Sequence, residues 1–164
     1  MDISILIGNG CSLIAMVLDS IGSTCRTARG MLLLQSVSTI IWAAGSIVLK
    51  GYSAAVQNLV ALLRNLAAIF KWQHKWLEYT LILLGVVLGV CFNNRGWLGL
   101  LPVIGNLVYS IAVFQTKDER ALKKAFIFSV ITYAIFNAVI LNIVGLIANI
   151  VNLTTTVIVL MKKS

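Results

Sequence analysis

Charged residues are scarce in this chain of 164 residues, at 11% of the total. Hydrophobic residues make up 60% of the sequence, and the mean hydropathy is +0.99. A soluble domain of this length needs far more polar surface than that. Apolar runs of about 18 residues or more are typical of membrane helices. The composition therefore excludes an ordinary soluble domain and predicts an integral membrane protein.

Residues that bind metals or catalyse reactions are also few. The three cysteines, Cys11, Cys25 and Cys91, are scattered and indicate neither a disulfide framework nor a CxxC metal site. The only histidine, His74, lies in a charged segment that we expect to be a solvated loop. The apolar segments offer no nucleophile beside a base. We therefore expect no metal, no cofactor and no enzymatic activity.

Seven apolar segments are separated by short polar breaks. At about 1.5 Å rise per residue, helices of this length just cross a bilayer core. Short connections make consecutive helices antiparallel neighbours. The predicted spans lie near residues 3–22, 31–49, 52–71, 77–94, 97–115, 123–140 and 143–161.

The basic residues divide unequally between the two ends of the predicted bundle. Lys50 and Arg95 fall at one end, and Arg64 lies inside a span. The positive-inside rule therefore predicts an extracytoplasmic N-terminus and a cytoplasmic C-terminus, and it accounts for the net charge of +8 without nucleic acid as a partner. The other ten basic residues, which fall at the predicted cytoplasmic end, are Arg26, Arg29, Lys71, Lys75, Lys117, Arg120, Lys123, Lys124, Lys162 and Lys163.

Residues 34–62 resemble residues 125–153 when the sequence is shifted by 91 positions. In this register Asn58 aligns with Asn149, and Trp42 aligns with Tyr133. We therefore predict an all-α membrane protein of seven transmembrane helices, arranged as two parallel triple-helix repeats. The predicted units are residues 1–72 and 97–164, joined by a linker helix in residues 73–96. Transporters built from such repeats bind their substrates between the repeats, near the middle of the membrane.

Polar side chains recur on the second and third helices of both predicted units. Trp42 lies four residues before Ser46, and Tyr133 lies four before Asn137, so each pair shares a helix face. Hydrogen bonding between packed helices is the alternative explanation for each polar residue. We predict a cavity for a small polar solute, lined by Trp42, Ser46, Asn58, Tyr133, Asn137 and Asn149.

Arg64 is the basic residue that falls within a predicted span. A charge there costs about 3 kcal/mol on insertion scales and needs a partner or water. Asp19 lies near the inner end of the first span, at a similar level. Three interpretations stay open: an ion pair with Asp19, a gate or anion-binding group, and a side chain that reaches the cytoplasmic headgroups.

The segments LLPVIGN (100–106), NLVALLRNLAAI (58–69) and IANIVNLTTTVIVLMKK (147–163) resemble the YgjV family of bacterial inner-membrane proteins. That resemblance implies a bacterial inner-membrane location. The three-one-three layout is also similar to the SWEET sugar facilitators and the PnuC vitamin-precursor transporters. The SWEET resemblance implies solute contacts at Asn58 and Asn149, with Trp42 and Tyr133 one helix earlier. The Pro-Gln motif of their PQ-loop relatives is missing.

These observations favour a facilitator that moves a small polar solute, such as a sugar, nucleoside or vitamin precursor, by alternating access. A single acidic residue in the predicted interior favours uniport over ion coupling. The alternative is a non-transporting membrane receptor or accessory subunit that uses the same bundle. The expected partners are the solute and the lipid bilayer, and the sequence leaves the oligomeric state open, a homo-oligomer included.

Overall fold

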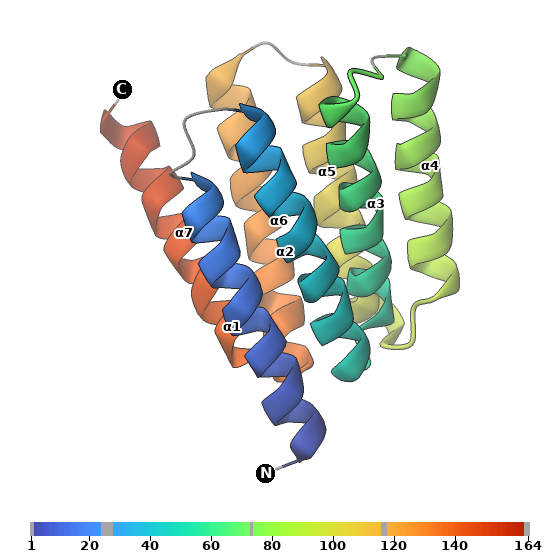
Figure 1. The fold of residues 1–164 in the computed structure, drawn as a ribbon, viewed down its shortest axis with the longest axis vertical. Helices are drawn as coiled ribbons and strands as arrows, with labels where there is room; N and C mark the ends of the chain where they lie inside the picture. The colour runs from blue at the N-terminus through green and yellow to red at the C-terminus, as the bar shows by residue number, and fades with distance from the viewer. Residues whose placement is uncertain (1, 24–27, 73, 116–117, 163–164) are drawn as a thin grey trace.

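The computed structural model describes residues 2–23, 28–72, 74–115 and 118–162, which form an up-and-down bundle of seven α-helices (Figure 1). These described residues contain no strand, so the predicted all-α class is confirmed. A short 3-10 helix, η1 (Gly96–Leu100), precedes the fifth helix. The α-helices are α1 (Ile3–Ser23), α2 (Ala28–Val48), α3 (Tyr52–Ile69), α4 (Lys75–Cys91), α5 (Leu101–Gln115), α6 (Glu119–Val139) and α7 (Ile143–Lys162).

The turns after α2 and α6 have the same geometry, which the end of α3 at Lys71 also adopts. Lys50 and Leu141 adopt left-handed backbone conformations, with φ of 56° and 60°. The next residues, Gly51 and Asn142, donate their amide hydrogens to the carbonyl five residues back, over 2.7 and 2.9 Å. This is the Schellman termination of a helix, which reverses the chain within three residues. Each pair of equivalent positions is 91 residues apart, the same shift that aligns the two sequence segments.

Contacts between helices close a ring in the order α1, α2, α3, α5, α6, α7. Neighbours along the chain supply most of the ring, while α1 packs on α7 and α3 packs on α5. Helix α4 lies outside the ring, against α3 and α5, at the edge of the bundle in Figure 1. Side chains from α2 and α6 therefore meet the interior of the bundle from opposite sides.

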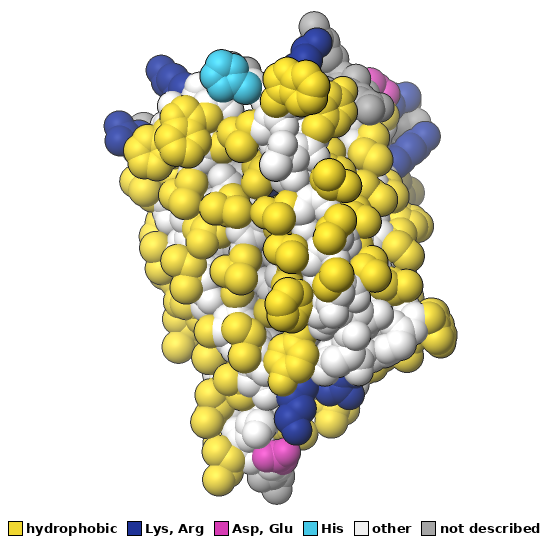
Figure 2. All heavy atoms as spheres, turned by 90° about the vertical axis from the view of Figure 1, so that its right-hand side faces the viewer, with side chains coloured by type: hydrophobic (Ala, Val, Ile, Leu, Met, Phe, Trp, Pro, Cys, Tyr) yellow, Lys and Arg dark blue, Asp and Glu magenta, His cyan; other side chains and the backbone are white. Residues whose placement is uncertain are grey.

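The exterior of the bundle is apolar between two charged ends. Figure 2 shows a broad hydrophobic surface, with lysine, arginine and histidine side chains gathered at one end and a few charges at the other. Large exposed side chains such as Ile3, Trp76 and Leu83 have 72%, 84% and 64% of their surface accessible. Such a continuous apolar surface is what a bilayer would cover.

Among the described residues, two helical stretches, Ile3–Gly22 and Arg120–Val139, are long and apolar enough to cross a membrane by themselves. Shorter apolar stretches run over Leu32–Val48, Gly96–Ala112 and Ile143–Ile158. The prediction of seven helices is thus confirmed, whereas a transmembrane position for all seven stays a prediction. Helix α1 begins at the end of the bundle opposite to the end where α7 finishes (Figure 1).

Candidate functional site

The carboxylate of Asp19 on α1 is held by two side chains of α2. The indole Nε1 of Trp42 donates a hydrogen bond to Oδ2 over 2.9 Å, and the hydroxyl of Ser38 donates to Oδ1. Ser38 and Trp42 lie four residues apart and therefore share one helix face. Ser38 lies ten residues from each end of α2, which begins at residue 28 and ends at residue 48. The carboxylate is therefore close to the middle of the bundle in depth.

Asp19 borders a cavity of about 550 Å³ between α1, α2 and α7. Trp42 lines this cavity from α2, and Asn149 and Asn152 line it from α7. Its volume is within the range of pockets that bind small molecules. Two of the predicted solute-binding residues, Trp42 and Asn149, therefore lie in one cavity, although they come from different halves of the chain. We name it the Asp19 cavity, lined by Met16, Asp19, Ser20, Trp42, Ile147, Ala148, Asn149, Val151 and Asn152.

The other four predicted site residues are placed elsewhere. Asn58 is half-buried on α3 and is not among the residues that line the Asp19 cavity. Tyr133 packs against the buried cluster of Leu49, Ala54, Phe136 and Ile140. Ser46 and Asn137 are buried just before the Schellman turns after α2 and α6, where their backbone carbonyls accept the turn hydrogen bonds. The structure therefore does not gather the six predicted residues in one cavity.

Asn137 belongs to a polar network that shapes the turn between α6 and α7. Its Oδ1 accepts a hydrogen bond from Nδ2 of Asn142 over 3.3 Å. Oδ1 of Asn142 in turn accepts the backbone N–H of Gly145 over 3.0 Å, which caps the first turn of α7. From α1, Asn9 donates to the carbonyl of Leu141 over 2.9 Å. These contacts stabilise the turn, which is the packing role that the sequence left open for such residues.

Arg64 is separated from Asp19. Its guanidinium carbon lies 5.9 Å from the ring centroid of Tyr109, above the ring face. Among the described residues no carboxylate lies within ion-pairing distance of Arg64, and Asp19 is bound by Ser38 and Trp42 instead. The predicted ion pair between Arg64 and Asp19 is therefore wrong. The two residues share a level in the bundle, but the helices direct their side chains to different partners.

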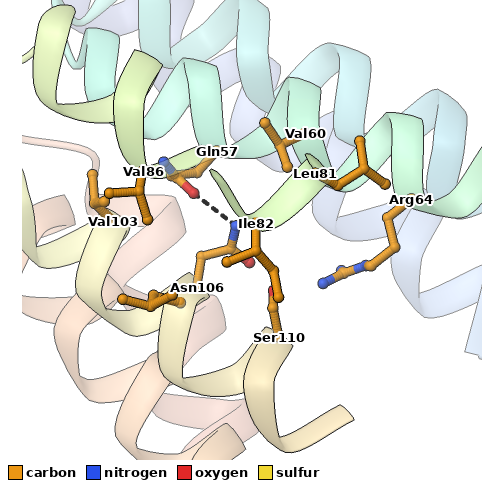
Figure 3. Close-up of a pocket in the computed structure, with 10 residues that line it drawn as sticks. Gln57, Val60, Arg64, Leu81, Ile82, Val86, Val103, Asn106 and Ser110 are labelled. Carbon is orange, nitrogen blue, oxygen red and sulfur yellow. Dashed lines mark hydrogen bonds between the residues drawn. The ribbon is translucent and has the colours of Figure 1, made fainter. Parts of the chain in front are cut away.

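The Arg64 side chain enters a small cavity between α3, α4 and α5 (Figure 3). Gln57 lies two helical turns before Arg64, on the same face of α3, and its amide donates to the carbonyl of Gly85 over 2.7 Å. Its Oε1 accepts a hydrogen bond from Nδ2 of Asn106 on α5, also over 2.7 Å. Ser110, one turn after Asn106, brings a buried hydroxyl to the same space.

This second cavity, the Arg64 cavity, has a volume of about 10 Å³. That is roughly the space one water-sized sphere needs. Sequence reasoning missed Gln57, Asn106 and Ser110 as its polar members. The seven-residue spacing from Gln57 to Arg64, which keeps both on one helix face, was the available signal. The cavity is lined by Gln57, Val60, Arg64, Leu81, Ile82, Val86, Val103, Asn106, Leu107 and Ser110.

The apolar exterior, the basic end and the charged side chains that border cavities between the helices define a helical integral membrane protein. Within the described part of the chain, no cluster of His, Cys, Asp and Glu could hold a metal ion. The chain belongs to the Imp-YgjV family, described as a bacterial inner membrane protein, whose profile matches residues 6–164. The inner-membrane assignment made from the sequence is thereby confirmed. Comparisons with curated proteins and with solved structures found no match.

Proposed function

We propose that this protein is a facilitator that moves a small polar solute across the bacterial inner membrane, with the Asp19 cavity as its binding site. The observation that carries the proposal is the presence of Asp19, Trp42 and Asn149 around one cavity of about 550 Å³. Ionisable side chains inside membrane bundles usually border a solute or ion pathway. A purely structural acid would need no cavity of this size beside it.

The lining of the Asp19 cavity suits a solute rich in hydrogen-bond donors. Each carboxylate oxygen of Asp19 accepts one hydrogen bond from α2 and keeps further capacity for a ligand. The amides of Asn149 and Asn152 offer both donors and acceptors. The Trp42 ring supplies a flat surface on which a sugar or a nucleobase can stack. These groups favour a sugar, a nucleoside or a vitamin precursor.

Alternating access is the mechanism that the bundle supports best. The Schellman turns after α2 and α6 lie 91 residues apart, and α1–α7 and α3–α5 are the contacts that join the halves of the ring. Two triple-helix units that rock about these contacts would open the Asp19 cavity to one side of the membrane at a time. The proposal keeps the predicted 3+1+3 repeat, with α4 as the linker outside the ring.

We further propose that the N-terminus is extracytoplasmic and the C-terminus cytoplasmic. The ten-to-two division of the basic residues outside the spans supports this orientation. We expect reporter fusions at Met1 and Ser164 to give opposite signals, with the cytoplasmic signal at Ser164. Equal signals from the two fusions would contradict both the orientation and an odd number of spans.

The transport proposal is tested by ligand-induced stabilisation followed by uptake. Purified protein is screened by thermal unfolding against sugars, nucleosides, vitamins and amino acids, because a ligand of the folded state raises the unfolding temperature. A solute that does so is then offered to proteoliposomes. We expect Asn149→Ala to lose both responses while the protein stays folded.

Asn58→Ala is the matched control for this experiment. It removes the same side chain from the repeat-related position, outside the Asp19 cavity. We expect the solute to raise the unfolding temperature of Asn58→Ala as it does for the wild type. A screen in which no polar solute stabilises the wild type would refute the facilitator and favour a receptor or accessory subunit. Retained binding in Asn149→Ala would place the solute elsewhere.

A further inference from the structure

The Arg64 cavity has no role in the function proposed above, and its chemistry is opposite to that of the Asp19 cavity. Arginine stays protonated at all physiological pH values, so the cavity carries a permanent positive charge. Six apolar side chains enclose much of it: Val60, Leu81, Ile82, Val86, Val103 and Leu107. A charge in such surroundings is strongly disfavoured unless it has a partner.

The protein supplies Arg64 with only weak compensation. The face of Tyr109 lies 5.9 Å from the guanidinium carbon, close to the limit of a cation–π contact. The described residues provide no carboxylate within ion-pairing distance. The Oε1 of Gln57 already accepts a hydrogen bond from Nδ2 of Asn106, which leaves Asn106 one amide hydrogen for another acceptor. The positive charge is therefore left without a negative partner among the residues that the structure describes.

We propose that the Arg64 cavity binds one halide-sized monovalent anion. The anion would lie between the guanidinium and the polar side chains of α5, Asn106 and Ser110, toward which Arg64 extends (Figure 3). Both of these side chains carry hydrogen-bond donors, as the anion requires. One ion at this position joins α3 to α5, a contact that closes the helix ring.

The size of the cavity restricts the ligand. A volume of about 10 Å³ admits one sphere close to a water molecule in size. Fluoride is close to this size and chloride is larger, whereas sulfate, phosphate and organic anions need several times the space. The ion would thus act as a fixed structural partner of Arg64, distinct from the solute of the Asp19 cavity.

The experiment measures thermal unfolding of the purified protein by its tryptophan fluorescence. Sodium chloride or sodium fluoride replaces sodium gluconate at constant ionic strength. We expect the unfolding temperature to rise saturably with halide, by about 5–10 °C at a hundredfold excess over the dissociation constant. Sulfate should raise it less, although sulfate generally stabilises folded proteins. Equal unfolding temperatures in halide and gluconate would overturn the proposal and leave a water molecule in the cavity.

Variants test whether the halide-dependent rise in the unfolding temperature comes from the Arg64 cavity. Arg64→Gln should lose the halide-dependent shift, while Arg29→Gln, which removes an exposed arginine from α2, should keep it. Ser110→Val leaves Arg64 in place but fills the cavity and removes a donor, so this variant should also lose the shift. It provides the test if Arg64→Gln fails to fold. A full halide response in Ser110→Val or in Arg64→Gln would show that the anion binds elsewhere and would overturn the proposal.

Discussion

Asp19 and Arg64 are half-buried charges within the described part of the bundle, and it compensates them in different ways. Asp19 receives hydrogen bonds from Ser38 and Trp42 and borders a cavity of about 550 Å³. Arg64 contacts the face of Tyr109 and enters a cavity of about 10 Å³. The acid thus has protein donors and room for a solute. The base has an aromatic neighbour and room for a single small ion or water.

The difference shows that a charge inside a membrane bundle has more than one physical explanation. Hydrogen bonds to a charged group contribute about 1.5–3 kcal/mol each, so two donors offset much of the cost of burying the Asp19 carboxylate. A cation–π contact contributes about 0.5–2 kcal/mol, which is less than the roughly 3 kcal/mol that an arginine costs on insertion scales. Removing each charge should therefore change stability in opposite directions.

The largest effect is expected for Asp19→Leu. This substitution leaves the Trp42 N–H without its acceptor in the middle of the bundle, whereas the Ser38 hydroxyl can still donate to the carbonyl of Gln35. An unsatisfied buried polar group costs about 1–3 kcal/mol. We expect the free energy of unfolding, measured by denaturant titration in detergent, to fall by about 1–3 kcal/mol.

Asp19→Asn is the matched control for this prediction. The amide keeps one carbonyl oxygen that can accept a hydrogen bond from Ser38 or Trp42, so we expect about half of the loss. Equal losses in Asp19→Asn and Asp19→Leu would mean that the negative charge stabilises the bundle. No loss in either variant would contradict a structural contribution from the two hydrogen bonds.

Much of the fold could be predicted from the sequence because the position of each helix depends on the order of apolar and polar residues along the chain. The apolar runs predict seven helices, and the breaks after the predicted spans 31–49 and 123–140 coincide with Schellman turns. The inner-membrane location followed from the family resemblance and is confirmed. The repeat, the transport activity and the resemblance to SWEET and PnuC proteins stay predictions.

The candidate site was harder to predict because it depends on the rotation of each helix. The rise per residue places Asp19 and Arg64 at similar depths, but depth does not say toward which neighbour a side chain points. Asp19 contacts Trp42, a predicted aromatic of the site, and Arg64 turns toward Tyr109 on α5. Likewise, the register that aligns Asn58 with Asn149 does not determine whether both face one cavity. Those orientations depend on how the helices cross.

The smallest effect is expected for Arg64→Met. This variant is also the sharpest test of the difference between the compensation of Asp19 and that of Arg64. Methionine is a straight, apolar side chain that can fill most of the space of the arginine stem without its charge. In halide-free buffer the loss of the Tyr109 contact should be outweighed by relief from burying a charge, because apolar replacements of buried ionic groups are often neutral or stabilising. We expect the free energy of unfolding to rise by about 1 kcal/mol or to stay unchanged. A loss of more than about 2 kcal/mol in that buffer would mean that the chain itself compensates Arg64 as fully as Asp19.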